Sequence, residues 1–77
     1  MTTFATNLRR LRRKKGLTQE QLATKAGMST SQLSHYECGR REPSLTNLRA
    51  LQEVLQCGYP AFFTNKNNDN TKIQNID

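Results

Sequence analysis

Small polar side chains recur at helical spacing in the middle of the chain. They are Thr30, Ser31, Ser34, His35 and Cys38, at positions i, i+1, i+4, i+5 and i+8. Side chains with this spacing share one face of an α-helix. Hydroxyls donate and accept hydrogen bonds, and a neutral imidazole does both through its two nitrogens. The chemistry available to this face is therefore hydrogen bonding to a polar partner surface.

The same residues do not make a catalytic centre. The chain has one histidine, no nucleophile beside an orienting base, no carboxylate pair with a credible pocket and no glycine-rich phosphate loop. Cys38 and Cys57 lack CxxC spacing and companion ligands, so they do not form a zinc site with His35. We therefore expect no enzyme, no metal and no cofactor, with Cys57 as a small apolar filler.

Two short helices are predicted to position the polar face. The Thr18 hydroxyl can accept from the Gln21 N–H while the Gln21 side chain reaches back to Thr18, which is a capping box. Gly27 can end that helix in a left-handed conformation. Ser29 then begins the second helix, and Gln32 stands at its third position, so the cap pattern repeats. Only a tight turn fits between the two helices.

The opposite faces of this helix pair are predicted to pack inward. The first helix contributes Leu22, Ala23 and Ala26, and the second contributes Leu33, Tyr36 and Glu37. A preceding helix is predicted from about Thr6 or Asn7 to Lys15, ending at Gly16, with Leu17 packing inward.

Two further helices are predicted after the pair. Ser44 caps the first of them, which Gly58 ends. Its core stripe consists of Leu45, Leu48, Leu51 and Leu55, with Val54 beside them. Pro60 suits the first turn of a short last helix.

The chain is strongly basic, with a net charge of +6 and a sequence pI of about 9.9. Six of the seven side chains from Arg9 to Lys15 are cationic. A polyanionic partner is the natural interpretation, with a solvated helix face or a membrane-surface helix as the alternative on charge alone. No run approaches the roughly 18 apolar residues that a membrane span needs, and we find no signal peptide. We therefore expect a soluble, cytoplasmic protein.

Further residues at fixed spacing carry a resemblance. The residues that carry the resemblance are Gln19, Ala23, Gly27, Leu33 and Glu37, followed by Gly39-Arg40 and Pro43-Ser44-Leu45. Over roughly residues 7 to 63 the chain resembles the helix-turn-helix family of phage repressors and Cro proteins, the XRE type. The resemblance implies an all-α fold, a compact lambda-repressor-like bundle of about five helices. Helices 2 and 3 would form the helix-turn-helix, and the domain would bind double-stranded operator DNA, usually as a two-fold dimer.

The resemblance also implies roles for single residues. The base-reading residues would be Thr30, Ser31, Ser34 and His35. The DNA-backbone residues would be Gln19, Gln32, Arg40, Arg41 and Asn47. Arg12 would form a partly buried ion pair with Glu37. We expect the neighbouring cations Arg9, Arg10, Arg13 and Lys14 to face solvent. Because hydroxyls stand where family members often carry longer amides or arginine, we also expect more reliance on water and DNA shape.

The chain is predicted to divide at residue 63. Residues 1–63 would form the DNA-binding domain, and the Asn-rich residues 64–77 would form a flexible tail that cannot bury enough apolar surface to offset its ordering entropy. Candidates for an apolar dimer patch are Tyr59, Phe62 and Phe63, for which capping the small core is the alternative role.

Two functional hypotheses follow. The leading one is a sequence-specific transcription regulator, most of all a repressor, that binds a palindromic operator as a homodimer. The alternative is an antitoxin-type interaction protein, whose main partner is another protein bound through the C-terminal tail.

Overall fold

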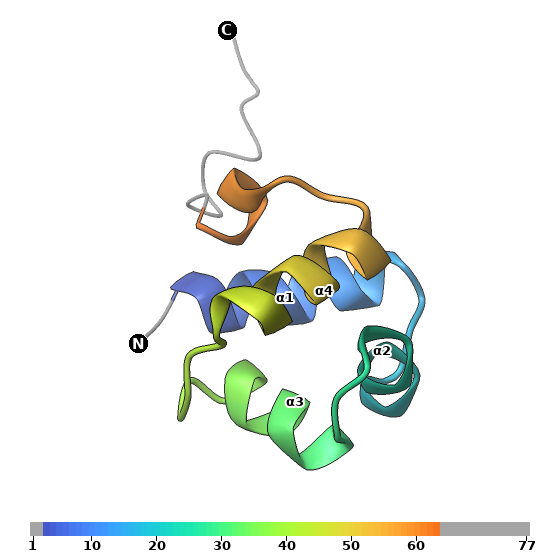
Figure 1. Cartoon of the computed structure of the whole chain (residues 1–77). Helices are drawn as coiled ribbons and strands as arrows, with labels where there is room; N and C mark the ends of the chain where they lie inside the picture. Colours follow the sequence, from blue (N-terminus) through green and yellow to red (C-terminus); the bar gives the residue numbers. More distant parts are fainter. Residues whose placement is uncertain (1–2, 64–77) are drawn as a thin grey trace, which may run out of the picture.

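The computed structural model describes residues 3–63 of the chain, which fold into helices joined by short connections (Figure 1). They are α1 (Thr3–Lys14), α2 (Gln19–Ala26), α3 (Thr30–Glu37), α4 (Leu45–Leu55) and the 3-10 helix η1 (Tyr59–Phe62). α1 packs against α3 and η1, and α2 packs against α3 and α4. η1 and α3 lie on opposite sides of α1 (Figure 1). The predicted all-α bundle is confirmed, with a 3-10 turn as its fifth element.

Side-chain caps fix where three of the helices begin. At α2 the Thr18 hydroxyl accepts from the Gln21 N–H at 3.0 Å, and the Thr18 N–H donates to the Gln21 side chain at 2.9 Å, so the predicted capping box is present. The Ser29 and Ser44 hydroxyls cap α3 and α4 by accepting from the Gln32 and Asn47 N–H groups, at 3.0 and 3.2 Å. Gly27, with a φ of +76°, ends α2 in the predicted left-handed conformation.

One apolar core joins the helices. Its buried members are Phe4, Leu8, Leu22, Ala23, Leu33, Tyr36, Leu48, Leu51, Leu55 and Phe62. Leu17, Ala26 and Val54 pack against this core from partly buried positions. Most of the predicted inward positions are therefore confirmed, and α2 and α3 turn their predicted faces to the core.

α1 begins earlier than the sequence predicted. It starts at Thr3, rather than at Thr6 or Asn7, and ends at Lys14. Tertiary contacts explain the extra turn, since the Phe4 ring lies 5.2 Å from the Phe62 ring, centroid to centroid. The buried Asn7 side chain donates to the Phe62 carbonyl at 2.8 Å. Both contacts are made with Phe62 of η1, far along the chain, so the residues around Thr3 do not by themselves predict them.

α4 differs from its prediction at both ends. Leu45, predicted for the core stripe, is 63% exposed and lies at the first residue of the helix. The helix ends at Leu55, and Gln56, with a left-handed φ of +55°, caps it in place of the predicted Gly58. Gly58 is extended and begins η1 instead.

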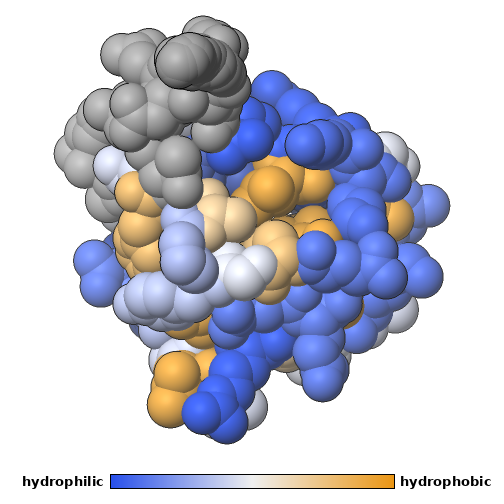
Figure 2. Space-filling view, turned by 90° about the horizontal axis from the view of Figure 1, so that it is seen from above, coloured by the Kyte–Doolittle hydropathy of each residue, from blue (hydrophilic) through white to orange (hydrophobic). Residues whose placement is uncertain are grey.

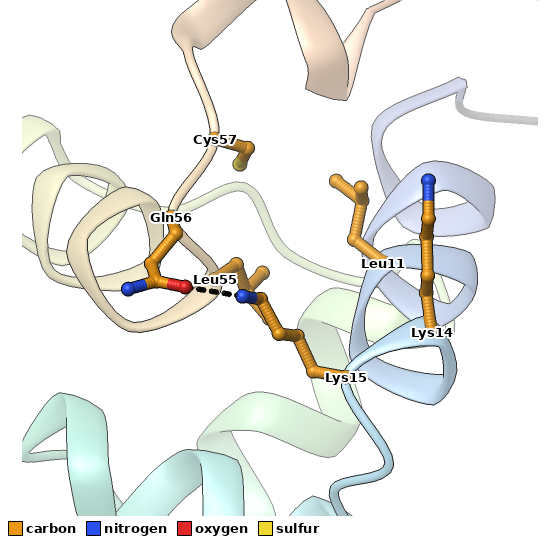
Figure 3. Close-up of a pocket in the computed structure, with 6 residues that line it drawn as sticks. All are labelled: Leu11, Lys14, Lys15, Leu55, Gln56 and Cys57. Carbon is orange, nitrogen blue, oxygen red and sulfur yellow. Dashed lines mark hydrogen bonds between the residues drawn. The ribbon is translucent and has the colours of Figure 1, made fainter.

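A cleft of about 350 Å³ separates the last turns of α1 and α4 (Figure 3). Leu11, Leu55 and Cys57 give it an apolar lining, and Lys15 reaches across to donate to the Gln56 side chain. Burial raises the pKa of the Cys57 thiol above its ordinary value, against a smaller opposite effect of the Lys15 charge. A thiol held protonated in this way is a poor nucleophile, which agrees with a packing role for Cys57.

No helix within residues 3–63 is both long enough and apolar enough to cross a bilayer. The Asn-rich tail predicted for residues 64–77 lies outside the described residues.

Candidate nucleic-acid interface

A buried carboxylate at the end of α3 fixes how this helix sits. Glu37 is 1% exposed and forms an ion pair with Arg12 of α1. Arg12 Nε donates to Glu37 Oε2 at 2.7 Å, and Arg12 Nη2 donates to Oε1 at 3.1 Å. The pair is therefore bidentate, the geometry that suits guanidinium and carboxylate best. The expected partly buried pair is present, since the Arg12 side chain is 12% exposed.

Further hydrogen bonds extend this pair into a network. Gln19 Nε2, at the start of α2, donates to Glu37 Oε1 at 3.0 Å, and Arg12 Nη1 donates to the Leu17 carbonyl at 2.9 Å. Arg9 Nη1 donates to the Glu37 carbonyl at 2.6 Å. Residues of α1 and α2 thus bind both the carboxylate and the last carbonyl of α3. The end of α3 cannot shift without breaking several charge-assisted bonds.

Two of the basic residues predicted to face solvent do not do so. Arg9 and Arg10 are half-buried, Arg9 against the end of α3 and Arg10 through a 3.1 Å bond from Nη2 to Asn7 Oδ1. Their long side chains lie along the protein surface before the charge reaches a partner. Arg13 and Lys14 are exposed as expected.

The small polar residues of α3 lie on its outward side. Thr30 and Ser31 are exposed at the start of the helix, Ser34 and His35 are half-buried, and Cys38 is exposed just after the end. We call these five residues the outer face of α3. It is short-chained and carries no fixed charge, and it leaves the hydroxyls of the first turn accessible to a large partner.

Two amides predicted to contact the DNA backbone, Gln32 and Asn47, have a common partner. Gln32 Nε2 donates to the Tyr36 hydroxyl at 3.1 Å, and Asn47 Nδ2 donates to the same oxygen at 2.8 Å. Both amide side chains are half-buried. Only half of the repeated capping box therefore forms at Ser29, because the Gln32 side chain turns to Tyr36 and not back to the helix start.

Arg40 and Arg41 lie in the connection between α3 and α4, and both are exposed. The Arg40 N–H donates to the His35 carbonyl at 2.9 Å, so the backbone at Arg40 is tied to the last turn of α3. Two guanidinium groups at this position place positive charge directly after the helix that carries the outer face.

The candidate dimer patch needs a correction at Phe62. Its side chain is fully buried against Phe4, so it serves the core, whereas Tyr59 and Phe63 are 54% and 46% exposed. The rings of Tyr59 and Phe63 lie 4.9 Å apart, beside a cleft of about 180 Å³ that Glu42 and Pro43 also line. On the face seen from above, hydrophobic residues are exposed near the middle and hydrophilic residues surround them (Figure 2).

Metal ligands do not cluster in the part of the chain that the structure describes, where no three His, Cys, Asp or Glu side chains could hold an ion together. Cys38 and Cys57 are both free thiols.

Comparison with known proteins identifies this arrangement. A family model described as Helix-turn-helix matches residues 8–62. The chain belongs to this helix-turn-helix family, of the XRE type. The resemblance noted from Gln19, Gly27 and Glu37 is thereby confirmed, and the family is one of transcription regulators and not of enzymes.

Two helix-turn-helix relatives are known from sequence. The HTH-type transcriptional regulator y4dJ of Sinorhizobium fredii is 47% identical over 49 residues, which cover 64% of this chain and 64% of that protein. The HTH-type transcriptional regulator YqaE of Bacillus subtilis is 30% identical over 66 residues, or 86% of this chain and 57% of that protein. The chain thus spans less than two thirds of either relative.

A solved helix-turn-helix structure is covered over a larger share of its length than these two sequence relatives. The restriction-modification controller protein C.AhdI of Aeromonas hydrophila superposes with a TM-score of 0.76 at 37% identity, covering 80% of this chain and 94% of that one. The similarity therefore includes nearly the whole of that protein.

Sequence reasoning missed several contacts around α3. The position of Arg9 one turn before Arg12 was a signal that both point toward α3. Nothing local indicated that Tyr36 would accept from Asn47, because that bond depends on how α4 packs against the helix-turn-helix.

Replacing Glu37 by Ala is expected to lower the free energy of unfolding by about 3–5 kcal/mol, because Arg12 is left with a desolvated, unpaired charge. Urea unfolding monitored by circular dichroism measures the change. Glu53→Ala is the matched control, since Glu53 is exposed on α4 and should change stability by less than about 0.5 kcal/mol. Equal effects of the two substitutions would contradict a structural role for the buried pair.

Proposed function

We propose that this chain is a sequence-specific regulator of transcription that binds double-stranded DNA as a symmetric dimer and acts as a repressor. The observation that carries the proposal is the outer face of α3. This face is exposed at the first turn of the helix, while Glu37 at the end of the helix is held by hydrogen bonds to α1 and α2. A helix that is held rigidly and presents small hydrogen-bonding groups suits the major groove.

The outer face supports direct contact with base edges. Thr30 and Ser31 stand at the exposed start of α3, and their hydroxyls can donate to or accept from any base pair. The Thr30 methyl can contact a thymine methyl, and His35 can bond to guanine N7 or O6. We assign base reading to Thr30, Ser31, Ser34 and His35.

The surrounding groups suit phosphates. Arg40 and Arg41 are exposed beside the end of α3, where they can contact the sugar-phosphate backbone. Gln19 already braces Glu37, and its place at the start of α2 allows a phosphate contact as well. Gln32 and Asn47 complete the proposed backbone contacts at the α4 side.

A dimer fits the size of the interface. One short helix covers a single half-site, so two copies with their α3 helices about 34 Å apart, one DNA turn, would bind an imperfect palindrome. For the contact between copies we propose the exposed apolar residues Tyr59 and Phe63, and we add Leu45 in place of the buried Phe62. A dimer bound across a promoter would block transcription, which is the basis for proposing repression.

Selection of bound sequences from a random duplex pool tests this function. We expect recovery of a palindrome whose half-sites are one helical turn apart, because two-fold symmetry of the protein is copied in its site. An unenriched pool would contradict sequence-specific binding, and enrichment of a single asymmetric half-site would contradict the dimer.

Base-reading and backbone residues should respond differently to substitution. His35→Ala is expected to change the base preferred at one position, whereas Arg40→Ala should weaken all duplexes alike and lower the salt slope by about one. Fluorescence anisotropy titrations against single-base variants of the selected duplex, at several salt concentrations, separate the two outcomes. A uniform loss of affinity in both variants would remove His35 from the base-reading set.

Tyr59→Glu should weaken dimerisation, since a symmetric interface would bring two new carboxylates into an apolar contact. We expect at least a tenfold weaker dimer by sedimentation equilibrium, with binding to a single half-site unchanged. Thr24→Glu, at an exposed position of α2, is the control for added negative charge. A variant that stays as dimeric as the control would place the interface elsewhere.

A further inference from the structure

The Tyr36 hydroxyl joins α3 to α4 at the edge of the outer face. Its ring is buried in the core, 3% exposed, and its oxygen accepts one bond from Gln32 and one from Asn47. A phenol oxygen has two acceptor lone pairs, and these two carboxamides occupy both. A core residue is thus used to order two polar side chains on neighbouring helices.

The two carboxamide nitrogens are brought close together by their common partner. Each side-chain amide carries two N–H groups and donates one of them to the Tyr36 hydroxyl. Because the two nitrogens lie 3.1 and 2.8 Å from the same oxygen, they are less than about 6 Å apart. One phosphate can span that separation by accepting from each nitrogen through a different oxygen. Gln32 and Asn47 are half-buried, so this pair of donors lies at the surface between α3 and the start of α4.

We propose that Tyr36 is a positioning residue, whose hydroxyl holds the Gln32 and Asn47 carboxamides in place to bind one phosphate of the DNA backbone together. The inference rests on the proposed function, and it assigns to these two amides a single shared phosphate and a common support. A phosphate accepts several donors at once and suits such a pair.

Fixing the two amide side chains before DNA binds strengthens binding, because less side-chain conformational entropy is lost on binding. A free glutamine or asparagine side chain loses rotamer freedom when it is fixed against a ligand. Here Tyr36 has fixed both before DNA arrives, so this loss does not oppose binding. The shared phosphate would also set the register of α3 in the groove without reading any base.

Tyr36→Phe tests the proposal, because it keeps the ring in the core and removes only the accepting oxygen. We expect binding about tenfold weaker, by the same factor for the duplex recovered in the selection and for a scrambled duplex of equal length, since a phosphate contact carries no sequence information. Thr24→Val also removes a hydroxyl, at an exposed position of α2 outside both proposed interfaces, and should leave both affinities unchanged.

A double-mutant cycle separates positioning from general stability. Asn47→Ala should weaken binding strongly in the wild-type chain and hardly at all in Tyr36→Phe, because the phenol acts through the amide. Independent, additive losses would overturn the proposal, as would an unchanged affinity of Tyr36→Phe or a loss confined to the selected duplex.

Two results keep this test separate from that of the function itself. If Tyr36→Phe does not fold by circular dichroism, Gln32→Ala and Asn47→Ala take its place, and losses that add without coupling overturn the shared phosphate. A wild-type chain that binds neither duplex would contradict DNA binding as a whole, whereas wild-type binding with an unaffected Tyr36→Phe contradicts only the role of the tyrosine.

Discussion

The buried carboxylate of Glu37 is the constraint on which the rest of the structure depends. A charge that is 1% exposed is tolerated only while its partners stay in place, and these partners come from α1 and α2. The net stabilisation of such a pair is small because both charges are desolvated, yet any arrangement that separates Arg12 from Glu37 is strongly disfavoured. The network therefore selects one orientation of α3 over its alternatives more than it strengthens the fold.

An eight-residue helix needs this external support. α3 is too short to be stable in isolation, since nucleation is unfavourable and few intrahelical bonds follow it. Its start is fixed by the Ser29 cap, its inner side by Leu33 and Tyr36 in the core, and its end by Arg9 and Glu37. With every other side engaged, the outer face is left for a partner, and its hydroxyls move only as far as their own short side chains allow.

Local signals in the sequence predicted what local physics decides. Caps at Thr18 and Ser44 and the apolar periodicity of α2 and α3 require only neighbours a few residues away, and the structure contains them. Two errors fall where distant residues decide: Phe62 is drawn into the core by Phe4, and α1 is lengthened by the same contact. The Arg12–Glu37 pair was predicted through family resemblance, because spacing within one helix cannot show which charges meet across two.

The basic cluster of α1 has to be reinterpreted in this light. Arg9 and Arg12 donate hydrogen bonds to α3, and Arg10 lies against Asn7. The basic side chains that are exposed there are Arg13, Lys14 and Lys15. The paired arginines still belong to a chain with a net charge of +6, and that field attracts a polyanion from a distance whatever its sequence. In the proposed function, discrimination between sequences is assigned to groups without a fixed charge. Such groups occur together on the outer face of α3, and because hydroxyls have short reach, only a rigid helix could make them useful. The arginines that turn toward α3 keep that helix in place, and in the proposed function this is their indirect contribution to recognition.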